Sequence, residues 1–552
     1  MESVTTGEGN APTEHRDSSW ERRSGGDAIR WLVSGDVDDL VLGAAGLDWF
    51  DLGGDSRAEL IKSNPRREIY RLAIGGRLYY VKSFRAPTLR DRVRSILQGS
   101  PAHREWKAAR RATAGGIPCP RFVAMGAGAG REWLVSEHAP GATILADAWL
   151  RAEAIPDAAE RRRCVVGIIE AAALLLATAH RTGFVHGDDH PHNILTTGKA
   201  AVEFQALYVD LVNVRFFRRV ARRRAVESLA QLHQWFRWRA SRAERLRFLR
   251  SYLRLRGVEG QGQGSLRFWA TDVVRATRVQ AARLWAKRDG RIGVANAYFA
   301  RLQPRPDVAA WVALRGDRGD VDGQAPSVER STEQWRRTLA DSQGGVEPAP
   351  PAFLAQVDRL PGRRWTWRRI VRQTDVGRRF VLGHRLRNRH VPSRCPAALL
   401  IITSPAIGVE TRVWFEAQPR TVSLVAFASD QAISRGKRKR MVTSLAKLVA
   451  RMADCGAFVR CASATTFAVA VEGDAVIIDD PLAVMLGETD ARRCALETVR
   501  ALRGLLGSDD RVRRTDVVRF LRGLDRRRWK SIWRQAISTG PHALPNWPDG
   551  GS

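Results

Sequence analysis

The segment FVHGDDHPHNIL (residues 184–195) gathers three histidines, two aspartates and an asparagine into one short polar stretch. It follows the apolar run CVVGIIEAAALLLATAH (164–180), which contains Glu170 and is too short to cross a bilayer comfortably, so we expect a buried helix. Asp188 precedes Asn193 by five residues, which is the spacing of a kinase catalytic loop. The segment therefore predicts phosphoryl transfer, in which Asp188 orients or deprotonates the acceptor hydroxyl and Asn193 holds magnesium.

Phosphoryl transfer also requires a cation beside the nucleotide phosphates and a second metal ligand. Lys82 lies at the end of the predicted strand YYVKSF, and Glu105 on the next predicted helix can pair with it. Asp210, in YVDL after another apolar strand, would be the second magnesium ligand. Alone, Lys82 and Glu105 read as ordinary surface residues, but the whole set in this order favours a kinase active site.

A zinc site is the alternative interpretation of the three histidines, His186, His190 and His192. The six cysteines of the chain show no C-x-x-C pair and no spacing typical of zinc ligands. The kinase interpretation makes His186 a structural brace of the loop and requires no role for the other two. It is therefore the preferred interpretation of this segment.

The order of the predicted elements indicates an α+β fold with a small β-rich lobe and a larger α-rich lobe, as in protein kinases. The stretch PRREIYRLAIGGRLYYVKSF (65–84) predicts two strands joined by a Gly-Gly turn. Helices begin near residue 146, and Arg-rich helices continue to about residue 312. The predicted organisation is a disordered leader (1–30), a kinase-like catalytic domain (31–314), a linker with a short helix near Trp335 (315–351), a degenerate kinase-like domain (352–545) and a tail (546–552).

Five segments carry a resemblance to a known family: HGDDHPHNIL, YVDLVNVRF, YYVKSF, REWKAARRATAGGIPCPR and RAVESLAQLHQWF. Together they resemble the bacterial lipopolysaccharide kinase (Kdo/WaaP) family over residues 60–255. The resemblance implies transfer of the ATP γ-phosphate to a sugar of the lipopolysaccharide inner core, with ATP and Mg²⁺ as cofactors. It gives the roles described above to Lys82, Glu105, Asp188, Asn193 and Asp210.

The resemblance extends to the connector between the lobes, SEHAPGATI, where backbone near Glu137 and His138 would receive the adenine. Two features depart from the family pattern. The residue after the catalytic aspartate is usually apolar, but here it is Asp189, which would either disturb metal binding or point to solvent. The strand pair before Lys82 also lacks a G-x-G-x-x-G loop.

The second half of the chain faintly repeats the first. In the same order, 368–385 parallels 67–85, 413–424 parallels 133–145, LVARMADCGAFVRCASATTFAVAVEGDAVIIDD parallels the catalytic-loop region, and RFLR recurs at 247–250 and 519–522. Matches that keep their order predict an internal duplication, and hence tandem kinase-like domains.

The second copy lacks most of the predicted catalytic groups. Arg460, Cys461 and Ala462 stand at His186, Gly187 and Asp188, Phe467 at Asn193, and Leu382 or Gly383 at Lys82. Asp479 keeps the place of Asp210. We therefore expect a pseudokinase that supports or docks the active domain.

The charge favours an anionic partner, because Lys and Arg number 91 against 58 Asp and Glu, a net charge of +33. An Arg-rich solvated surface would have the same composition. FFRRVARRR (216–224) would suit an anionic glycolipid acceptor, whereas SRGKRKR (434–440) reads as a solvated face or a contact with acidic lipid. Nucleic acid is disfavoured as a partner, and the oligomeric state is left open.

The expected location is the cytoplasm, with peripheral contact at the inner membrane face left open, because the polar N-terminal stretch lacks an apolar signal and the scattered cysteines suit a reducing compartment. Two other functions were weighed. A protein Ser/Thr kinase is disfavoured because 211–225 leaves no room for an activation segment. A non-catalytic scaffold or nucleic-acid-binding protein is disfavoured by the complete set of catalytic residues.

Overall fold

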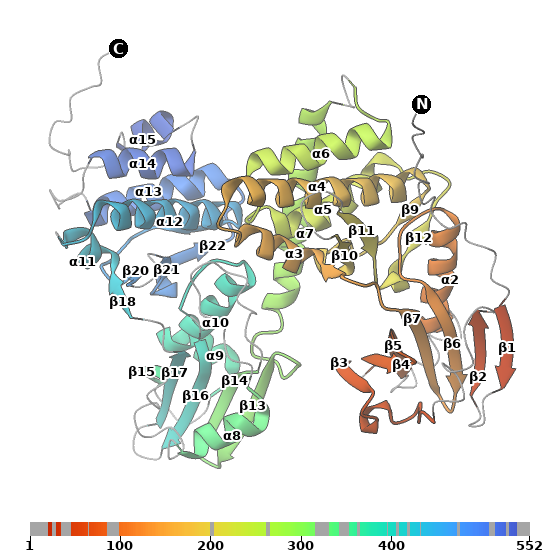
Figure 1. The fold of residues 1–552 in the computed structure, drawn as a ribbon. Coiled ribbons are helices and arrows are strands. Elements are labelled where there is room, and N and C mark those ends of the chain that lie inside the picture. Colours follow the sequence, from red (N-terminus) through yellow and green to blue (C-terminus); the bar gives the residue numbers. More distant parts are fainter. Residues whose placement is uncertain are drawn as a thin grey trace. The chain divides into compact units, whose positions relative to one another are not determined.

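The computed structural model describes residues 20–24, 29–34, 46–64, 66–85, 99–198, 204–260, 265–314, 330–341, 353–360, 365–394, 396–404, 408–416, 420–430, 432–471, 475–506, 514–525 and 529–537. The chain forms two compact units, Met1–Gln280 and Ala281–Ser552 (Figure 1). The predicted linker at 315–351 therefore does not coincide with the boundary between the units.

The small lobe of the first unit is a seven-stranded antiparallel sheet in the order β1-β2-β6-β7-β5-β4-β3. Its strands are β1 (Trp20–Ser24), β2 (Arg30–Ser34), β3 (Ala58–Asn64), β4 (Arg67–Ile74), β5 (Arg77–Arg85), β6 (Phe122–Gly128) and β7 (Arg131–Glu137), and the short helix η2 (Leu52–Gly54) precedes β3. Gly75 and Gly76 join β4 to β5 with φ of 55° and 74°, a left-handed pair that matches the twist of a hairpin. The strand pair predicted here is confirmed.

Helix α2 (Pro101–Ala114) packs on one face of this sheet. Its start is defined by Ser100, whose side chain accepts a hydrogen bond from the His103 N–H, and by Pro101 in the first turn. Ala102, Trp106 and other apolar residues of the helix share a core with the large lobe. The helix therefore connects the sheet to the part of the molecule that carries the catalytic loop.

The large lobe of the first unit combines helices with short strands. Its elements are β8 (Thr143–Ile144), α3 (Leu145–Glu153), α4 (Ala158–Arg181), β9 (Phe184–Val185), η3 (Pro191–Asn193), β10 (Ile194–Thr197), β11 (Gln205–Tyr208), η4 (Leu211–Asn213), β12 (Arg215–Phe216), α5 (Arg222–Phe236), α6 (Arg242–Arg256) and α7 (Leu266–Asp289). Strand β10 pairs with β8 and β11, and β9 pairs with β12. Helix α7 continues across the boundary into the second unit.

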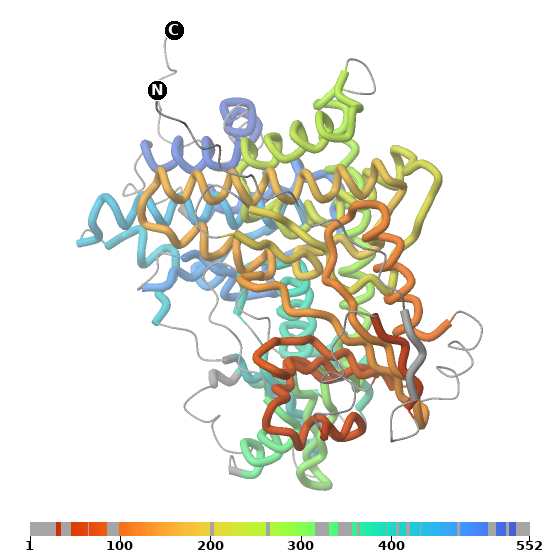
Figure 2. Tube along the Cα trace, turned by 45° about the vertical axis from the view of Figure 1, so that its right-hand side comes forward, coloured from red at the N-terminus to blue at the C-terminus, as the bar shows by residue number. Residues whose placement is uncertain are grey.

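Helix α4 is the buried helix predicted from the apolar run. It lies beside α6 in both views (Figures 1 and 2), and Ile168, Leu175 and Leu176 are in the core. By length and composition alone α4 could also cross a membrane, but 61% of its most apolar window is buried in the protein. A core helix of this kind passes the same test, so α4 gives only weak evidence for a membrane span.

The second unit begins with a five-stranded sheet in the order β13-β14-β16-β17-β15. Its first elements are β13 (Phe299–Arg305), β14 (Val308–Ala313), α8 (Thr332–Asp341), β15 (Phe353–Leu360), α9 (Trp367–Gln373), α10 (Asp375–Asn388), β16 (Pro396–Ser404) and β17 (Gly408–Glu416). Those that follow are β18 (Thr421–Ser423), α11 (Leu424–Ser429), α12 (Arg435–Asp454), β19 (Ala457–Val459), β20 (Phe467–Ala470), β21 (Val476–Ile478), η7 (Pro481–Ala483), β22 (Val484–Leu486), α13 (Ala491–Leu506), α14 (Arg514–Leu524) and α15 (Trp529–Ile537).

The two units contain similar elements in the same order from α2 and α10 onward. Each has a helix, two long strands, a short strand, a short helix, a long helix, and then four short strands with a 3-10 turn before the last one. The pairings agree as well, because β8-β10-β11 and β9-β12 correspond to β18-β20-β21 and β19-β22.

Three sequence expectations need correction. The disorder predicted over 1–30 is wrong for Trp20–Ser24, which form β1 and pair with β2, whereas residues 1–19 lie outside the described residues. Residues 299–313 form β13 and β14 rather than helix, because the almost wholly buried run VAAWVA lies between two strands of the second sheet. The helix near Trp335 is present, but Trp335 is fully buried in the core of the second unit instead of lying in a solvated linker.

The proposed match of 368–385 to 67–85 is wrong, because the first segment forms α9 and α10 whereas the second forms β4 and β5. Buried Val376, Phe380 and His384 follow each other at intervals of four residues, the spacing of a helix face. Thr374 caps α10 by accepting from the Gly377 N–H. Leu382 and Gly383 therefore cannot stand in the place of Lys82.

Candidate active site

The predicted catalytic loop lies between β9 and β10, and its start is held in place by His186 and Gly187. His186 is buried, stacks on Tyr208 with ring centroids 4.8 Å apart, and its Nε2 lies 2.9 Å from the Val209 carbonyl oxygen. Gly187 has φ 81°, and a Cβ there would lie 2.8 Å from the Asn213 carbonyl oxygen. Only glycine fits this position, so the backbone between His186 and Asp188 is restricted to one path.

Asp188 and Asn193 lie together, as the five-residue spacing predicts. Asp188 is exposed. The Asn193 side-chain amide donates to the Asp188 backbone carbonyl at 3.0 Å and to Asp188 Oδ2 at 3.0 Å. The carboxylate is thus oriented by a neighbour while one of its faces remains accessible. This arrangement suits a group that must receive an acceptor hydroxyl.

Lys82 and Glu105 form the ion pair predicted from the sequence. Lys82 is on β5, between β4 and β7 in the sheet, opposite Ile69 on β4 and Leu134 on β7. Its ammonium group pairs with Glu105 of α2, whose side chain is fully buried. Glu105 Oε1 also accepts from the Leu211 N–H at 3.1 Å, so a single carboxylate links the lysine strand to the residue after Asp210.

Asp210 is paired with an arginine that the sequence analysis missed. Asp210 has φ 62° and precedes η4, and its Oδ1 accepts from Arg67 Nη1 at 3.0 Å. Burial raises the pKa of Asp210, but the charges of Lys82 and Arg67 outweigh burial and leave that pKa below its ordinary value. Asp210 is therefore held as a carboxylate. Arg67 follows the β3–β4 turn and had no sequence signal to distinguish it from the other arginines.

The donor set suits magnesium better than zinc. The Asp210 carboxylate and Asn193 amide supply hard oxygen ligands, and the Val209 N–H bonds to the Asn193 carbonyl at 2.9 Å, which holds their two strands together. Among the residues the structure describes, no group of three His, Cys, Asp or Glu side chains could hold a metal ion. His190 and His192 lie against each other, with Nδ1 atoms 3.1 Å apart, while His186 is turned away toward Val209.

The connector residues Glu137 and His138 have their N–H groups already bonded. The Glu137 N–H donates to the Arg121 carbonyl at 2.9 Å, and the His138 N–H donates to the Leu78 carbonyl at 2.9 Å. Arg121 also pairs with the Glu137 side chain at 2.8 Å. The N–H groups of these two residues therefore cannot donate to adenine in this arrangement, and the predicted adenine contact stays a prediction.

Asp189 follows neither sequence expectation. Its side chain has an exposed fraction of 0%, so it points neither to solvent nor to the metal position. Its two carboxylate oxygens accept from the Tyr208 hydroxyl at 2.9 Å and the Ser228 hydroxyl at 2.6 Å. Its backbone N–H donates to Gln231 Oε1 at 2.7 Å.

Gln231, on α5, is a second residue that the sequence analysis missed. Besides accepting from the Asp189 N–H, it donates through Nε2 to the Gly187 carbonyl at 3.3 Å. It therefore holds the backbone on both sides of Asp188. The segment RAVESLAQLHQWF was recognised as a family feature, but a contact 42 residues distant in sequence leaves no local pattern.

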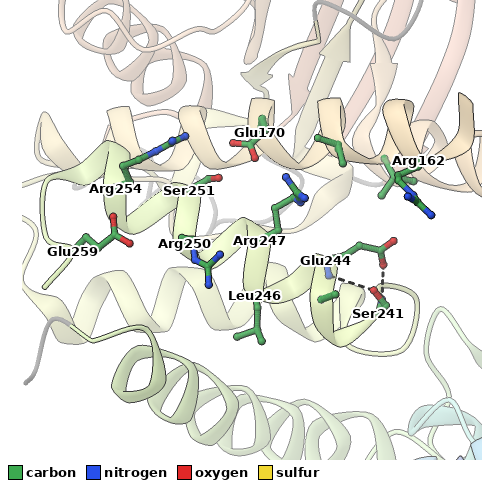
Figure 3. Close-up of a pocket in the computed structure, with 13 residues that line it drawn as sticks. Arg162, Glu170, Ser241, Glu244, Leu246, Arg247, Arg250, Ser251, Arg254 and Glu259 are labelled. Atoms are coloured by element: carbon green, nitrogen blue, oxygen red, sulfur yellow. Dashed lines mark hydrogen bonds between the residues drawn. The ribbon is translucent and has the colours of Figure 1, made fainter. Parts of the chain in front are cut away.

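A cavity of about 720 Å³ lies on the large lobe, away from these groups, between α4 and α6 (Figure 3). Its charged lining comes from both helices and includes Arg162 and Glu170 of α4 and Arg247, Arg250 and Arg254 of α6. None of the predicted catalytic, metal or adenine residues lines it. Glu244 and Glu259 also line it, so arginines and glutamates are both present in the lining.

The second unit contains a loop in the position of the catalytic loop, but with other residues. The 3-10 turns η4 and η7 are preceded by Asp210 and Asp480, and the N–H groups of Val209 and Asp479 bond to the Asn193 and Thr466 carbonyls. Asp480 therefore corresponds to Asp210, whereas the sequence match placed Asp479 there. The same register places Cys461 at Asp188 and Thr466 at Asn193.

Both aspartates at this point of the second unit are paired with arginines. Arg379 of α10 donates to Asp480 Oδ1 at 3.2 Å, and Arg394 donates to Asp479 Oδ1 at 2.6 Å. Arg379 and Glu105 each lie four residues after the first residue of their helix. A cation thus replaces the carboxylate that holds Lys82 in the first unit.

Part of this chain is similar to known proteins. A structure of WaaP in complex with acyl carrier protein matches 42% of this chain and 93% of its own at 23% identity, with a TM-score of 0.32. The bifunctional kinase-methyltransferase WbdD matches 38% of this chain and 47% of its own at 19% identity, with a TM-score of 0.26. None of the curated proteins matches the chain. Residues 60–252, about a third of the chain, match the model of the lipopolysaccharide kinase (Kdo/WaaP) family, and this match identifies the first unit as a kinase.

Proposed function

We propose that the first unit transfers the γ-phosphate of Mg-ATP to a sugar hydroxyl of an inner-core-type lipopolysaccharide glycolipid. The observation that carries the proposal is the joined set Lys82–Glu105–Leu211 and Asp188–Asn193, within the residues that match the family. The family supplies the acceptor class, and the geometry supplies the groups needed for phosphoryl transfer.

Each group has a part in the transfer that its environment supports. Glu105 holds Lys82, so the ammonium group can bind the nucleotide phosphates without searching many rotamers. Asp188, oriented by Asn193, would accept the hydrogen bond of the acceptor hydroxyl. Asn193 and Asp210 would hold magnesium, which neutralises charge on the phosphates when bound.

We also propose that the second unit is a degenerate copy of the kinase fold without phosphoryl transfer. The shared order of elements and strand pairings supports common architecture. Cys461 and Thr466 replace the acceptor-orienting aspartate and the metal-binding asparagine, while Arg379 and Arg394 pair with the two aspartates. Its retained apolar core suggests a supporting or docking role.

The acceptor is proposed to be an anionic glycolipid at the cytoplasmic face of the inner membrane. Arg215, Arg218 and Arg219 are exposed on the segment that runs from the metal position to α5. This segment pairs with β9 directly before the catalytic loop, with Arg215 opposite Val185. Its shortness also disfavours a protein kinase, because only residues 211–221, which include η4 and β12, separate Asp210 from α5.

The test is transfer of labelled γ-phosphate by the full chain to lipopolysaccharide core glycolipid, with a generic protein substrate in parallel. Asp188→Ala is the inactive variant, and His192→Ala is its matched control because His192 is exposed on the same loop. Label in the glycolipid with wild type and His192→Ala, absent with Asp188→Ala, supports the proposal. Label in protein alone would assign a peptide acceptor, and no ATP turnover would favour a scaffold.

A further inference from the structure

We propose that Asp189 is a positioning residue, which anchors the catalytic loop to the large lobe so that Asp188 faces the acceptor. The proposal rests on the function proposed for the first unit. Asp188 is exposed whereas Asp189 has an exposed fraction of 0%. Adjacent residues thus point in opposite directions, and fixing the second side chain determines the direction of the first.

The peptide around Asp189 is held by its backbone as well as by its side chain. Gln231 accepts from the Asp189 N–H and donates to the Gly187 carbonyl. Tyr208 and Ser228 each donate a hydroxyl proton to the Asp189 carboxylate. A rotation of the loop would break several of these bonds at once, and it would leave a buried carboxylate without donors, which is costly.

The hydrogen bonds beyond Ser228 have one consistent direction. The Ser228 proton goes to Asp189, so His180 Nε2, 3.0 Å away, donates to the Ser228 oxygen. His180 Nδ1 must then accept from the Tyr252 hydroxyl at 2.7 Å, whose oxygen accepts from Arg256 Nη1 at 3.0 Å. Each donor therefore points along the chain toward the Asp189 carboxylate, an arrangement in which hydrogen bonds strengthen one another.

This chain ties the loop to three helices and keeps its direction over a wide pH range. His180 is on α4, Ser228 on α5, and Tyr252 and Arg256 on α6. Burial lowers the pKa of His180 to about 3, so the ring stays neutral with one donor and one acceptor nitrogen. Burial also raises the pKa of Tyr208 well above its ordinary value, so its hydroxyl keeps the proton that it donates.

An apolar residue in this position would fill the space but make none of these bonds. Asp189 therefore replaces a packing contact with a directional one, and its partners are the buried hydroxyls of Tyr208 and Ser228. A buried polar network with all members bonded specifies a single arrangement of the chain. The consequence expected here is a catalytic loop with a fixed geometry before substrate binds.

The test compares Asp189→Leu, Asp189→Asn and Ser228→Ala in the full chain. The matched control is Thr277→Val, which removes a buried hydroxyl. This hydroxyl bonds to the Val273 carbonyl at 2.7 Å, the Ala230 carbonyl at 3.5 Å and His233 Nδ1 at 3.0 Å, and none of these partners lies in 186–193. Hydrogen exchange of the peptide that contains 186–193 reports loop order without requiring activity. Steady-state transfer of phosphate to core glycolipid reports kcat and the KM for ATP separately.

We expect kcat to fall about 100-fold in Asp189→Leu and about 10-fold in Ser228→Ala, because small displacements of a catalytic group have effects of this size. Asp189→Asn should lie between wild type and Asp189→Leu, since its carbonyl oxygen still accepts one hydroxyl. The KM for ATP should change less than about twofold, because nucleotide groups lie elsewhere. The 186–193 peptide should exchange faster in these variants but not in Thr277→Val.

The two proposals fail in different ways. If wild type transfers phosphate and Asp189→Leu does so equally well, the positioning role is overturned. Unchanged exchange of the 186–193 peptide in Asp189→Leu would overturn it as well. If wild type transfers no phosphate to the glycolipid, the proposed function fails, and hydrogen exchange alone decides whether Asp189 anchors the loop.

Discussion

The catalytic loop of the first unit and the corresponding loop of the second share a backbone framework but differ in charge. Both loops follow a long helix and a paired short strand, and in both units an aspartate further along the chain precedes a 3-10 turn. In the first unit a buried glutamate of α2 holds a lysine beside that aspartate. In the second, an arginine of α10 pairs with the aspartate itself.

This difference shows that the framework and the chemistry depend on separate residues. The framework requires apolar contacts and glycines. Gly183 and Gly456 occupy corresponding positions, where a Cβ would lie 1.9 Å from the Phe217 carbonyl oxygen and 2.3 Å from the Glu488 carbonyl oxygen. The chemistry requires Asp188, Asn193 and Lys82, which have no equivalents in the second loop. The shared framework therefore does not by itself carry the residues that phosphoryl transfer needs.

The largest expected effect comes from replacing Asp188 by alanine, compared with the same replacement at the corresponding position of the second unit. Asp188→Ala should lower kcat by about 1,000-fold, the range expected on removing a general base. Cys461→Ala, at the corresponding position of the second unit, should leave kcat unchanged. Rates of labelled phosphate transfer with the two variants decide the matter, and an effect of Cys461→Ala as large as that of Asp188→Ala would place chemistry in the second unit.

Glu105→Gln should have the next largest effect, because it leaves Lys82 without its partner in a buried site. We expect kcat to fall about 100-fold through misplacement of the ammonium group, and the unfolding free energy to fall by about 3 kcal/mol. Arg379→Gln, at the same helix position in the second unit, should not change kcat. Kinetics and chemical denaturation measure the two quantities. Normal activity in Glu105→Gln would show that phosphate transfer does not require Lys82 held by Glu105.

Arg394→Ala should destabilise the second unit without affecting transfer. Asp479 would lose a bond of 2.6 Å in a mostly buried position, which we expect to cost about 2 kcal/mol. Denaturation followed by Trp fluorescence, together with the transfer assay, tests this. Gain of Mg-ATP binding by the second unit would show that the arginine pairs, rather than the missing ligands, prevent nucleotide binding.

Arg67→Ala should have the smallest effect and appear mainly at acid pH. Burial raises the pKa of Asp210 and the charges of Lys82 and Arg67 lower it, with a net decrease, so this group stabilises the fold above its unfolded pKa and loses that contribution as pH falls through its folded pKa. Removing Arg67 should raise the folded pKa and shrink the contribution. Unfolding free energies between pH 7 and pH 3 should converge for the two proteins at the acid end; parallel curves would exclude this pairing.

Local spacing was enough to predict that Asp188 lies beside Asn193 and that Lys82 pairs with Glu105. Asp188 and Asn193 lie in one short segment, and Lys82 and Glu105 lie on a strand and the helix that follows it. The local sequence pattern is therefore enough to identify both pairs. Arg67 pairs with Asp210 across 143 residues, and no local pattern records such a contact. Both Arg67 and the inward direction of Asp189 therefore required the structure.

The second unit was harder to predict because similar apolar content can fold as helix or strand. The match of 368–385 to two strands rested on a few shared residue types, whereas the interval of four between Val376, Phe380 and His384 favoured helix. VAAWVA, at 308–313, has no alternation because both of its faces are largely buried, so it could not be separated from a buried helix.

The measurement that tests the central claim most directly is mass spectrometry of core glycolipid after incubation with Mg-ATP and the full chain. The account predicts one added phosphate with wild type and with Cys461→Ala, and unmodified glycolipid with Asp188→Ala. Unmodified glycolipid with folded wild-type protein, or equal phosphorylation by Asp188→Ala, would contradict a glycolipid kinase centred on this loop.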